Sequence, residues 1–394
     1  MKQKDMNEDI PKSAYVHIPF CRRRCFYCDF PVSVVGDRLR GENSGTISQY
    51  VEALCQEINI TPTTNQPLET IFFGGGTPSL LAVTQLQKIL DTLEQRFGIA
   101  TGVEISMEVD PGTFDLALLA GYQSLGVNRV SLGVQALQAE LLKVAGRSHS
   151  VEDIFASVEL IHQVAIPEFS IDLISGLPHQ SLDQWQDSLN QAIKIAPTHI
   201  SIYDLTIEPR TPFGRYYQSG ANPLPTDETT VKMYQLAQQI LTSAGYQHYE
   251  ISNYAQTGHQ CRHNRVYWEN RPYYGFGMGA ASYVEGKRFT RPRTTREYYQ
   301  WVQSGAVVDC EVTPPEEMLL ETLMLGLRLA EGVNVRSLAA NFGQHQINKI
   351  NKCLQPYFIK EWVEVVGERL RLSDPEGFLF SNVVLSSLFK ELGQ

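Results

Sequence analysis

Hydrophobic and polar positions follow two alternating patterns from Ser13 to about Thr206. Short runs rich in β-branched and aromatic residues, typical of buried strands, alternate with segments whose apolar residues recur every three or four positions, typical of amphipathic helices. Strands separated by helices pair in parallel through right-handed crossovers, so the pattern predicts an α/β fold with a partial, TIM-like (βα)6 barrel. The expected strands lie near Tyr15–Ile18, Thr70–Phe73, Glu104–Val109, Arg129–Gly133, Phe169–Ile174 and Ile200–Leu205, and the helices between them include Ile47–Ile58 and Leu86–Phe97.

The alternation stops after Thr206. A helix is expected at Glu228–Ala244, residues 246–299 are dense in tyrosine, arginine and glycine, and the pattern is mostly helical from Pro314 onward. A β-hairpin expected at Val363–Leu372 after several helices predicts a winged-helix-like cap. The other expected helices of the cap are Glu316–Ala330, Val335–Phe342, Gln346–Phe358 and Phe378–Leu392. We therefore expect a flexible N-terminus (1–12), the α/β partial barrel (13–245), an aromatic and basic connecting region (246–313) and the mostly helical C-terminal cap (314–394).

Composition narrows the functional classes. A net charge of −10 argues against nucleic-acid binding, because proteins that neutralise phosphates collect positive charge. No apolar run approaches the roughly 20 residues of a membrane-spanning helix. The first twelve residues also lack the apolar stretch of a secretory signal, so we expect a cytoplasmic protein. In that reducing compartment, cysteines that cluster in the sequence indicate metal binding rather than disulfides.

Three of the seven cysteines fall within eight residues, directly after the first expected strand: Cys21, Cys25 and Cys28. This spacing lets one loop surround a compact metal centre. An iron–sulfur cubane is usually bound by four thiolates, so three local thiolates leave one iron open to an exchangeable ligand. A zinc ion bound by these cysteines and completed by His17 or a distant ligand is the alternative that the spacing leaves open.

Other strand ends carry residues that suit a ligand site, because barrel sites lie at the C-terminal ends of the strands. The second strand runs into a GGGTP turn at residues 74–78, and its glycines permit close backbone approach to a ligand. Polar residues interrupt the ends of the next strands at Glu108, Asp110, Gln135 and Asp172. A buried carboxylate needs a partner or a ligand, although each of these residues taken singly fits an ordinary core role.

The CxxxCxxC spacing and these strand ends together resemble the radical SAM superfamily, most closely the oxygen-independent coproporphyrinogen oxidase and its relatives. The resemblance covers roughly Ser13–Pro315 strongly and the cap more loosely. It implies a [4Fe–4S] cluster on the three cysteines, with an open iron that chelates S-adenosylmethionine. It also implies that S-adenosylmethionine is contacted by Tyr15, Tyr27, Gly75, Gly76, Thr77, Glu108, Gln135, Arg147, Asp172 and Thr206.

Two features depart from the oxidase and match its heme-chaperone relatives. The oxidase has a fourth cysteine two residues after the third, where this chain has Asp29-Phe30, and it carries a longer N-terminal extension. The segment Cys261–Trp268 contains an HNxxYW pattern associated with those relatives. Histidine and cysteine ligate heme iron, and aromatic rings pack on the macrocycle, although a structural role is the alternative for a lone histidine. The resemblance therefore implies a heme site at Cys261, His263, Asn264, Tyr267 and Trp268.

A basic run between Lys287 and Arg296 follows this segment, and we expect it to form a solvated face. Heme propionates and an anionic membrane surface are the functional alternatives for the run. Its members are Lys287, Arg288, Arg291, Arg293 and Arg296.

The sequence leaves functions of different classes open. The favoured one is a heme carrier, monomeric or homodimeric, which holds the cluster, S-adenosylmethionine and heme and passes heme to an acceptor apoprotein such as a respiratory cytochrome. The alternative is a coproporphyrinogen III oxidase-type enzyme, in which the reduced cluster cleaves S-adenosylmethionine to a 5′-deoxyadenosyl radical. A winged-helix DNA regulator is a third option, which the acidic overall charge disfavours.

Overall fold

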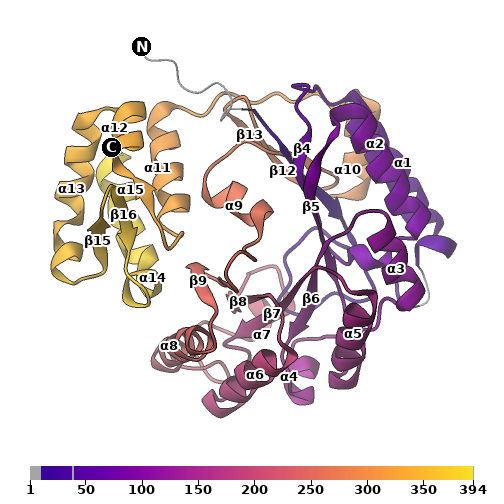
Figure 1. Cartoon of the computed structure of the whole chain (residues 1–394), viewed down its shortest axis with the longest axis horizontal. Coiled ribbons are helices and arrows are strands. Elements are labelled where there is room, and N and C mark those ends of the chain that lie inside the picture. Colours follow the sequence, from indigo (N-terminus) through magenta and orange to yellow (C-terminus); the bar gives the residue numbers. More distant parts are fainter. Residues whose placement is uncertain (1–9, 38–39, 394) are drawn as a thin grey trace.

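The computed structural model describes residues 10–37 and 40–393, and Figure 1 shows how their elements are arranged. A nine-stranded sheet organises most of the chain, with the strand order β11-β1-β4-β5-β6-β7-β8-β10-β9. Strands β1 to β8 of this order pair in parallel, β11 joins β1 in parallel, and β10 and β9 join antiparallel. The strands are β1 (Ser13–Ile18), β4 (Leu68–Gly75), β5 (Ile99–Val109), β6 (Arg129–Gln135), β7 (Glu168–Ser175), β8 (His199–Asp204), β9 (Gln247–Glu250), β10 (Asn253–Ala255) and β11 (Tyr274–Phe276).

Helices connect the parallel strands and cover the outer face of the sheet (Figure 1). Their apolar sides pack with the strands into one large hydrophobic core. The helices are α1 (Gly45–Ile60), α2 (Val83–Phe97), α3 (Leu116–Ser124), α4 (Ala139–Val144), α5 (Val151–Val164), α6 (Leu182–Ile195), α7 (Pro212–Tyr216) and α8 (Asp227–Ser243). The parallel α/β architecture expected from the alternating pattern is therefore present, and each of the six expected strands is found.

The region after α8 adds strands that the sequence pattern does not reveal. Strand β11 extends the sheet beyond β1, with Ala14 opposite Tyr274, and β9 and β10 extend the opposite edge. Much earlier in the chain, two short strands, β2 (Phe20–Cys21) and β3 (Ser33–Val34), pair beside the cysteine loop. The remaining elements after α8 are α9 (Arg262–Trp268), the hairpin of β12 (Ala281–Val284) and β13 (Lys287–Thr290), and α10 (Thr295–Gln303).

The C-terminal part has its own hydrophobic core, and Figure 1 shows it beside the barrel. The expected order of helices followed by a hairpin is present. The elements are α11 (Pro315–Gly326), β14 (Val333–Asn334), α12 (Val335–Phe342), α13 (Gln344–Ile359), β15 (Val363–Val366), β16 (Arg369–Leu372), α14 (Glu376–Leu379) and α15 (Ser381–Leu392).

Two of the expected helices in this part are wrong in extent. The helix expected over 316–330 ends at Gly326, although Leu327 and Leu329 continue the buried pattern outside the helix. The helix expected over 378–392 is divided at Phe380 into α14 and α15. Buried residues follow the end of the first helix, and partly buried Leu379 and Phe380 lie at the break in the second, so apolar periodicity alone does not mark where these helices stop.

The flexible N-terminus expected for 1–12 falls largely outside the described residues, and the described Lys12 forms an ion pair with Glu69. Among residues 10–37 and 40–393, no helix has the length and apolar character needed to cross a membrane.

A buried ion pair fastens the connecting region to the barrel. Glu57 of α1 is fully buried, and its carboxylate accepts hydrogen bonds from Arg291 Nε (2.7 Å), the Gly277 backbone N–H (2.8 Å) and the Tyr298 hydroxyl (2.7 Å). Arg291 is itself only 3% exposed. A buried carboxylate held by one cation and two further donors is satisfied, whereas removal of one member leaves an uncompensated charge.

We expect Glu57→Gln to lower the free energy of unfolding by about 3–5 kcal/mol, because it leaves the Arg291 guanidinium buried without a counter-charge. Urea denaturation of the metal-free protein measures this change. Glu52→Gln is the matched control, since Glu52 lies on the same helix and pairs with Lys88 in an exposed ion pair. The control is expected to cost less than about 1 kcal/mol, and equal losses in the two variants would contradict the structural role of the buried pair.

Candidate cofactor site at the carboxyl ends of the strands

The cysteine loop leaves the carboxyl end of β1 and lies over one large cavity. Cys21, Cys25 and Cys28 all line this cavity, whose volume is about 640 Å³. The short β2–β3 pair anchors the two ends of the loop, and the Cys28 backbone N–H donates to the Cys25 carbonyl within it (3.3 Å). The loop therefore presents three sulfur atoms to the space above the parallel strands.

The thiols of the loop carry protons that a metal centre would displace. Among the described residues, no three His, Cys, Asp or Glu side chains are grouped as a site for a metal ion. Burial raises the pKa of Cys21 to about 12 and also raises that of Cys28, so loading a metal requires these thiols to release protons.

The GGGTP turn lies directly beside the loop because β1 and β4 are in parallel register, with Ile18 opposite Gly75. A Cβ on Gly76 would stand 2.7 Å from the Phe20 carbonyl oxygen, closer than real contacts allow. Gly75 has a φ of +110°, a conformation that disfavours residues with side chains. Both glycines are therefore required for the turn to pass under the cysteine loop.

Asp110 joins the GGGTP turn to the cysteine loop. Its carboxylate accepts a hydrogen bond from Thr77 Oγ1 (3.1 Å) and an ion-paired bond from Arg147 Nη2 (2.6 Å). The other terminal nitrogen of Arg147 donates to Cys25 Sγ (3.2 Å) and to the Tyr27 hydroxyl (3.4 Å). Arg147 thus places a positive charge beside one of the sulfur atoms.

Two carboxyl groups face the cavity from the neighbouring strands. Burial raises the pKa of Glu108 to about 8, although the Gly75 N–H donates to its carboxylate at 2.9 Å. Burial also raises the pKa of Asp172 to about 6, and Asp172 Oδ1 accepts from Ser131 Oγ at 2.8 Å. A ligand that donates hydrogen bonds or carries positive charge would be stabilised between these groups.

The structure brings together nearly all of the residues that the resemblance implies for S-adenosylmethionine. Tyr15 is the exception, since it lines an adjoining cavity of about 480 Å³ inside the barrel, where its hydroxyl is hydrogen-bonded to His17 Nδ1 (2.9 Å). The residues lining the 640 Å³ cavity with the cysteines are Tyr27, Gly75, Gly76, Thr77, Glu108, Gln135, Arg147, Asp172 and Thr206.

Sequence reasoning did not assign several other residues of this cavity. The sequence marks Asp110 only as a polar residue at a strand end. Its role in joining the GGGTP turn to the cysteine loop becomes clear when the structure places Arg147 beside it. Arg23, Arg24, Tyr203 and Arg293 also line the cavity. Arg23 and Arg24 lie within the cysteine motif and Arg293 within the basic run, whereas no sequence pattern marks Tyr203.

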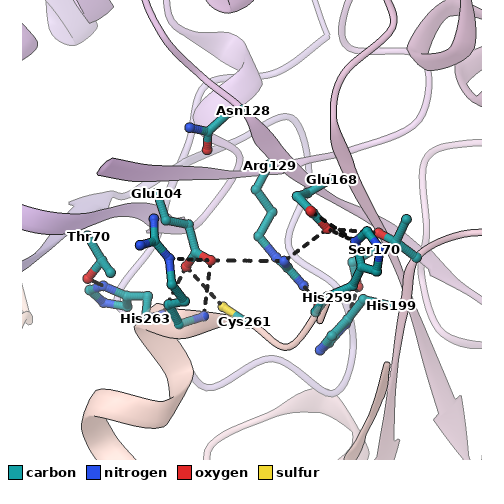
Figure 2. Close-up of polar contacts among 12 residues, drawn as sticks. Thr70, Glu104, Asn128, Arg129, Glu168, Ser170, His199, His259, Cys261 and His263 are labelled. Carbon is teal, nitrogen blue, oxygen red and sulfur yellow. Dashed lines mark hydrogen bonds and ion pairs between the residues drawn. The ribbon is translucent and has the colours of Figure 1, made fainter. Parts of the chain in front are cut away.

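The HNxxYW segment lies at the opposite end of the barrel, where it forms α9. Figure 2 shows Glu104 of β5 among the residues of this segment, and its carboxylate accepts from the backbone N–H groups of Arg262 (3.0 Å) and His263 (2.9 Å). Glu104 thereby caps the N-terminus of α9, because the N-cap residue Cys261 supplies no side-chain bond of that kind. The helix is thus anchored against the amino-terminal ends of the strands.

His263 is enclosed in this anchor. Its side chain is 0% exposed, Nδ1 is hydrogen-bonded to Thr70 Oγ1 (2.8 Å) and Nε2 to the Tyr267 hydroxyl (2.8 Å). Burial lowers its pKa to about 3, so the ring is neutral. Both ring nitrogens therefore have partners, and neither is open to a heme iron in this arrangement.

The other members of the motif face two different spaces. Cys261 is 2% exposed, and its Sγ lies 3.6 Å from Glu104 Oε1. Cys261, Asn264 and Tyr267 line the 480 Å³ cavity inside the barrel. Trp268 lines a separate groove toward the C-terminal domain.

The solvated face expected of the basic run is present only in part: Arg293 and Arg296 are exposed, whereas Arg291 is buried. Arg291 is buried against Glu57, Arg288 pairs with Glu321 of α11 (3.1 Å) and Arg293 donates to the Asp29 carbonyl (2.9 Å). The expectation is wrong for Arg291 because its counter-charge comes from a helix more than 200 residues earlier in the chain. These arginines fasten the β12–β13 region to three other parts of the protein.

A parallel α/β sheet with a three-cysteine loop beside a GGGTP turn defines a radical SAM protein. Residues 15–192 match the family model described as the Radical SAM superfamily, and residues 313–380 match the HemN C-terminal domain. The solved structure of coproporphyrinogen III oxidase (HemN) from Escherichia coli has the same fold, with a TM-score of 0.82 and 23% identity over 96% of this chain and 90% of that chain.

Curated relatives narrow the class further. The chain is 48% identical to the heme chaperone HemW of Synechocystis over 97% of both chains. It is 36% identical to the HemW of Bacillus subtilis (84% of this chain, 87% of the relative) and 39% identical to the HemW of Escherichia coli (77% and 79%). The chain belongs to the HemW family.

The raised pKa of Glu108 predicts a specific pH dependence of stability. Its usual value is 4.5 and its folded value about 8, so between these values the folded state binds more protons than the unfolded state, and this carboxyl lowers stability as the pH rises. Glu108→Gln removes this contribution. The free energy of unfolding of the variant, relative to the parent, is therefore expected to increase from about pH 5 to about pH 8.

Urea unfolding of the metal-free protein at both pH values measures the effect. Glu159→Gln, an exposed carboxyl on α5, serves as the control and is expected to give the same difference at both pH values. A pH-independent difference for Glu108→Gln would show that the Glu108 carboxyl is ionised in the folded protein.

Proposed function

We propose that the protein is a heme chaperone, which binds a [4Fe–4S] cluster, S-adenosylmethionine and heme, and transfers the heme to an acceptor protein. The observation that carries the proposal is the 48% identity to a heme chaperone HemW across 97% of both chains. The departures from the oxidase, namely Asp29-Phe30 in place of the fourth cysteine and the HNxxYW segment, support the same function. The proposed setting is the cytoplasm, where free thiols such as those of this chain persist.

The residues of the 640 Å³ cavity fit the two cofactors. Cys21, Cys25 and Cys28 would hold the cluster, whose open iron, when bound, supplies the chelation site for the amino and carboxylate groups of S-adenosylmethionine. The backbone at Gly75 and Gly76 passes close to the loop without a side chain in the way. The chain therefore offers a floor for the methionine end of the ligand directly beside the cysteines.

The acidic pair below the loop would select the charge of the ligand. Glu108 and Asp172 face the cavity from β5 and β7, and their pKa values are raised by burial to about 8 and about 6. A ligand carrying an ammonium and a sulfonium group would lower both pKa values through its positive charge. Arg147, already paired with Asp110, would remain available to the Cys25 sulfur.

Each cysteine of the loop is expected to be required for the cluster. Cys25→Ser should lose most of the roughly four irons per chain and the associated absorption, because serine is a poor ligand for this cluster. Anaerobic reconstitution followed by iron and sulfide analysis measures the loss. Cys310→Ser is the control, as Cys310 lies outside the cavity and is expected to leave the iron content unchanged. Stoichiometric zinc with no iron in the parent protein would contradict the assignment.

Two assays on the same reconstituted protein distinguish the heme-carrier function from the oxidase function. The carrier is expected to take up heme near one equivalent and to release it to an apo-cytochrome, with little conversion of coproporphyrinogen III in the presence of S-adenosylmethionine and a reductant. Absorption spectra report heme uptake and transfer, and chromatography reports protoporphyrinogen. Sustained oxidase turnover without heme uptake would favour the enzyme instead.

A further inference from the structure

His17 lies at the base of the cysteine loop and is not among the residues proposed above to hold the cofactors. It is in β1, four residues before Cys21, and is only 2% exposed. In the parallel register of β1 and β4 it is opposite Gly74 of the GGGTP turn. A polar ring buried at this position needs hydrogen-bond partners for its nitrogens.

Both ring nitrogens of His17 have such partners. Nε2 lies 3.0 Å from the Pro31 carbonyl oxygen, and Nδ1 lies 2.9 Å from the Tyr15 hydroxyl oxygen. A carbonyl can only accept, so Nε2 carries the ring proton and donates to Pro31. Burial lowers the pKa of His17 to about 4, so the ring is neutral and Nδ1 accepts from Tyr15. With both nitrogens engaged, His17 is not the fourth ligand of a zinc site in this arrangement.

The Pro31 bond fixes the arm by which the chain leaves the cysteine loop. Pro31 comes three residues after Cys28, the last cysteine of the loop. Arg24 and Arg293 also donate to backbone carbonyls of this arm, but both side chains are exposed to water, which competes for such bonds. The His17 donor is buried, and a buried donor that loses its acceptor is costly.

The His17 ring also lies against the glycine turn. A Cβ on Gly75 would stand 2.3 Å from Cε1 and Nδ1 of the ring, so the ring occupies the space that a side chain at this position would need. The Tyr15 ring is equally close to the neighbouring glycine, since a Cβ on Gly74 would stand 3.1 Å from Tyr15 Cε2. One imidazole therefore connects the cysteine loop, the glycine turn and the Tyr15 hydroxyl.

We propose that His17 is a positioning residue for both cofactors, because Nε2 holds the outgoing arm of the cysteine loop through Pro31 and Nδ1 holds the Tyr15 hydroxyl. The inference rests on the cluster and S-adenosylmethionine sites of the proposed function and adds a residue outside their ligand sets. The Pro31 bond limits the movement of the loop, and three corners of a cubane need three sulfurs at fixed positions. The Tyr15 bond commits the hydroxyl proton to His17, so this hydroxyl can only accept a hydrogen bond from a ligand.

Two substitutions that each keep part of the imidazole chemistry test the loop bond in the full-length protein. The amide of His17→Gln reaches about as far as Nε2 and can still donate to Pro31, whereas the shorter amide of His17→Asn reaches only to the position of Nδ1. After anaerobic reconstitution, His17→Gln is expected to hold iron as the parent does. His17→Asn and His17→Ala are expected to hold it at least about tenfold more weakly, as the loss of groups that orient metal ligands commonly does. Competition with an iron chelator measures the difference.

The Tyr15 bond is tested by the electron paramagnetic resonance signal of the reduced cluster, which changes when S-adenosylmethionine binds at the open iron. Tyr15→Phe removes the hydroxyl, and His17→Gln removes the acceptor at Nδ1, while both keep the Pro31 bond. Both variants are expected to need about two- to tenfold more S-adenosylmethionine for half of the spectral change, the range expected for one lost hydrogen bond. Parental midpoints in both variants would contradict the role assigned to Nδ1.

His199→Ala is the matched control for His17→Ala. His199 is also 2% exposed with both nitrogens bonded, to Ser170 (2.8 Å) and Tyr249 (2.8 Å), but it lies at the amino end of β8. The control removes a comparable buried ring and is expected to hold iron as the parent does, so iron loss in both alanine variants would contradict a role specific to the loop.

The remaining outcomes separate this inference from the cluster assignment. If the parent holds a cluster and His17→Ala holds it as firmly, the positioning role is wrong while the cluster assignment stands. If His17→Gln loses iron as readily as His17→Asn, the bond to Pro31 is not what holds the loop, and the proposal is wrong. A parent protein that takes up no iron would overturn the cluster assignment and this inference together.

Discussion

Parallel strand pairing is the constraint on which the rest of the structure depends. Because β1, β4, β5, β6 and β7 run in the same direction, their carboxyl ends meet at one edge of the sheet. The register of Ile18 opposite Gly75 brings the cysteine loop to the GGGTP turn. One hydrogen-bonding pattern therefore assembles a cofactor cavity from segments that are more than a hundred residues apart.

The amino ends of the same strands must be covered, because an open end would admit solvent to the barrel. Helix α9 closes them, and a strand residue, Glu104, caps it. Two residues of this segment are bonded within the closure: His263 to Thr70 and Tyr267, and Cys261 to Glu104. In the sequence, the HNxxYW segment suggests a set of ligands. In the structure, His263 and Cys261 help hold α9 against the strands, and the Trp268 indole faces outward.

The sequence predicted those features that are local in the chain and failed where the partner is distant. The six core strands are short runs rich in apolar residues, and the strand-end motifs stand next to them, so the arrangement of the cavity followed from known topology. Strand β11 has only three residues, and its partner β1 lies about 260 residues earlier. The burial of Arg291 and the closure of His263 likewise depend on Glu57 and Thr70, which no pattern in the chain connects to them.

The link between Glu57 and the segment 277–298 has a consequence for how the chain can be divided. A fragment ending after α8 would retain every cysteine of the loop and almost all of the cofactor cavity. It would nevertheless expose the free edge of β1, which β11 covers in the intact chain, and bury a carboxylate whose donors had been cut away. In the structure, the edge of β1 and the Glu57 carboxylate are both partnered by residues between β11 and α10, so a fragment that ends after α8 lacks these partners.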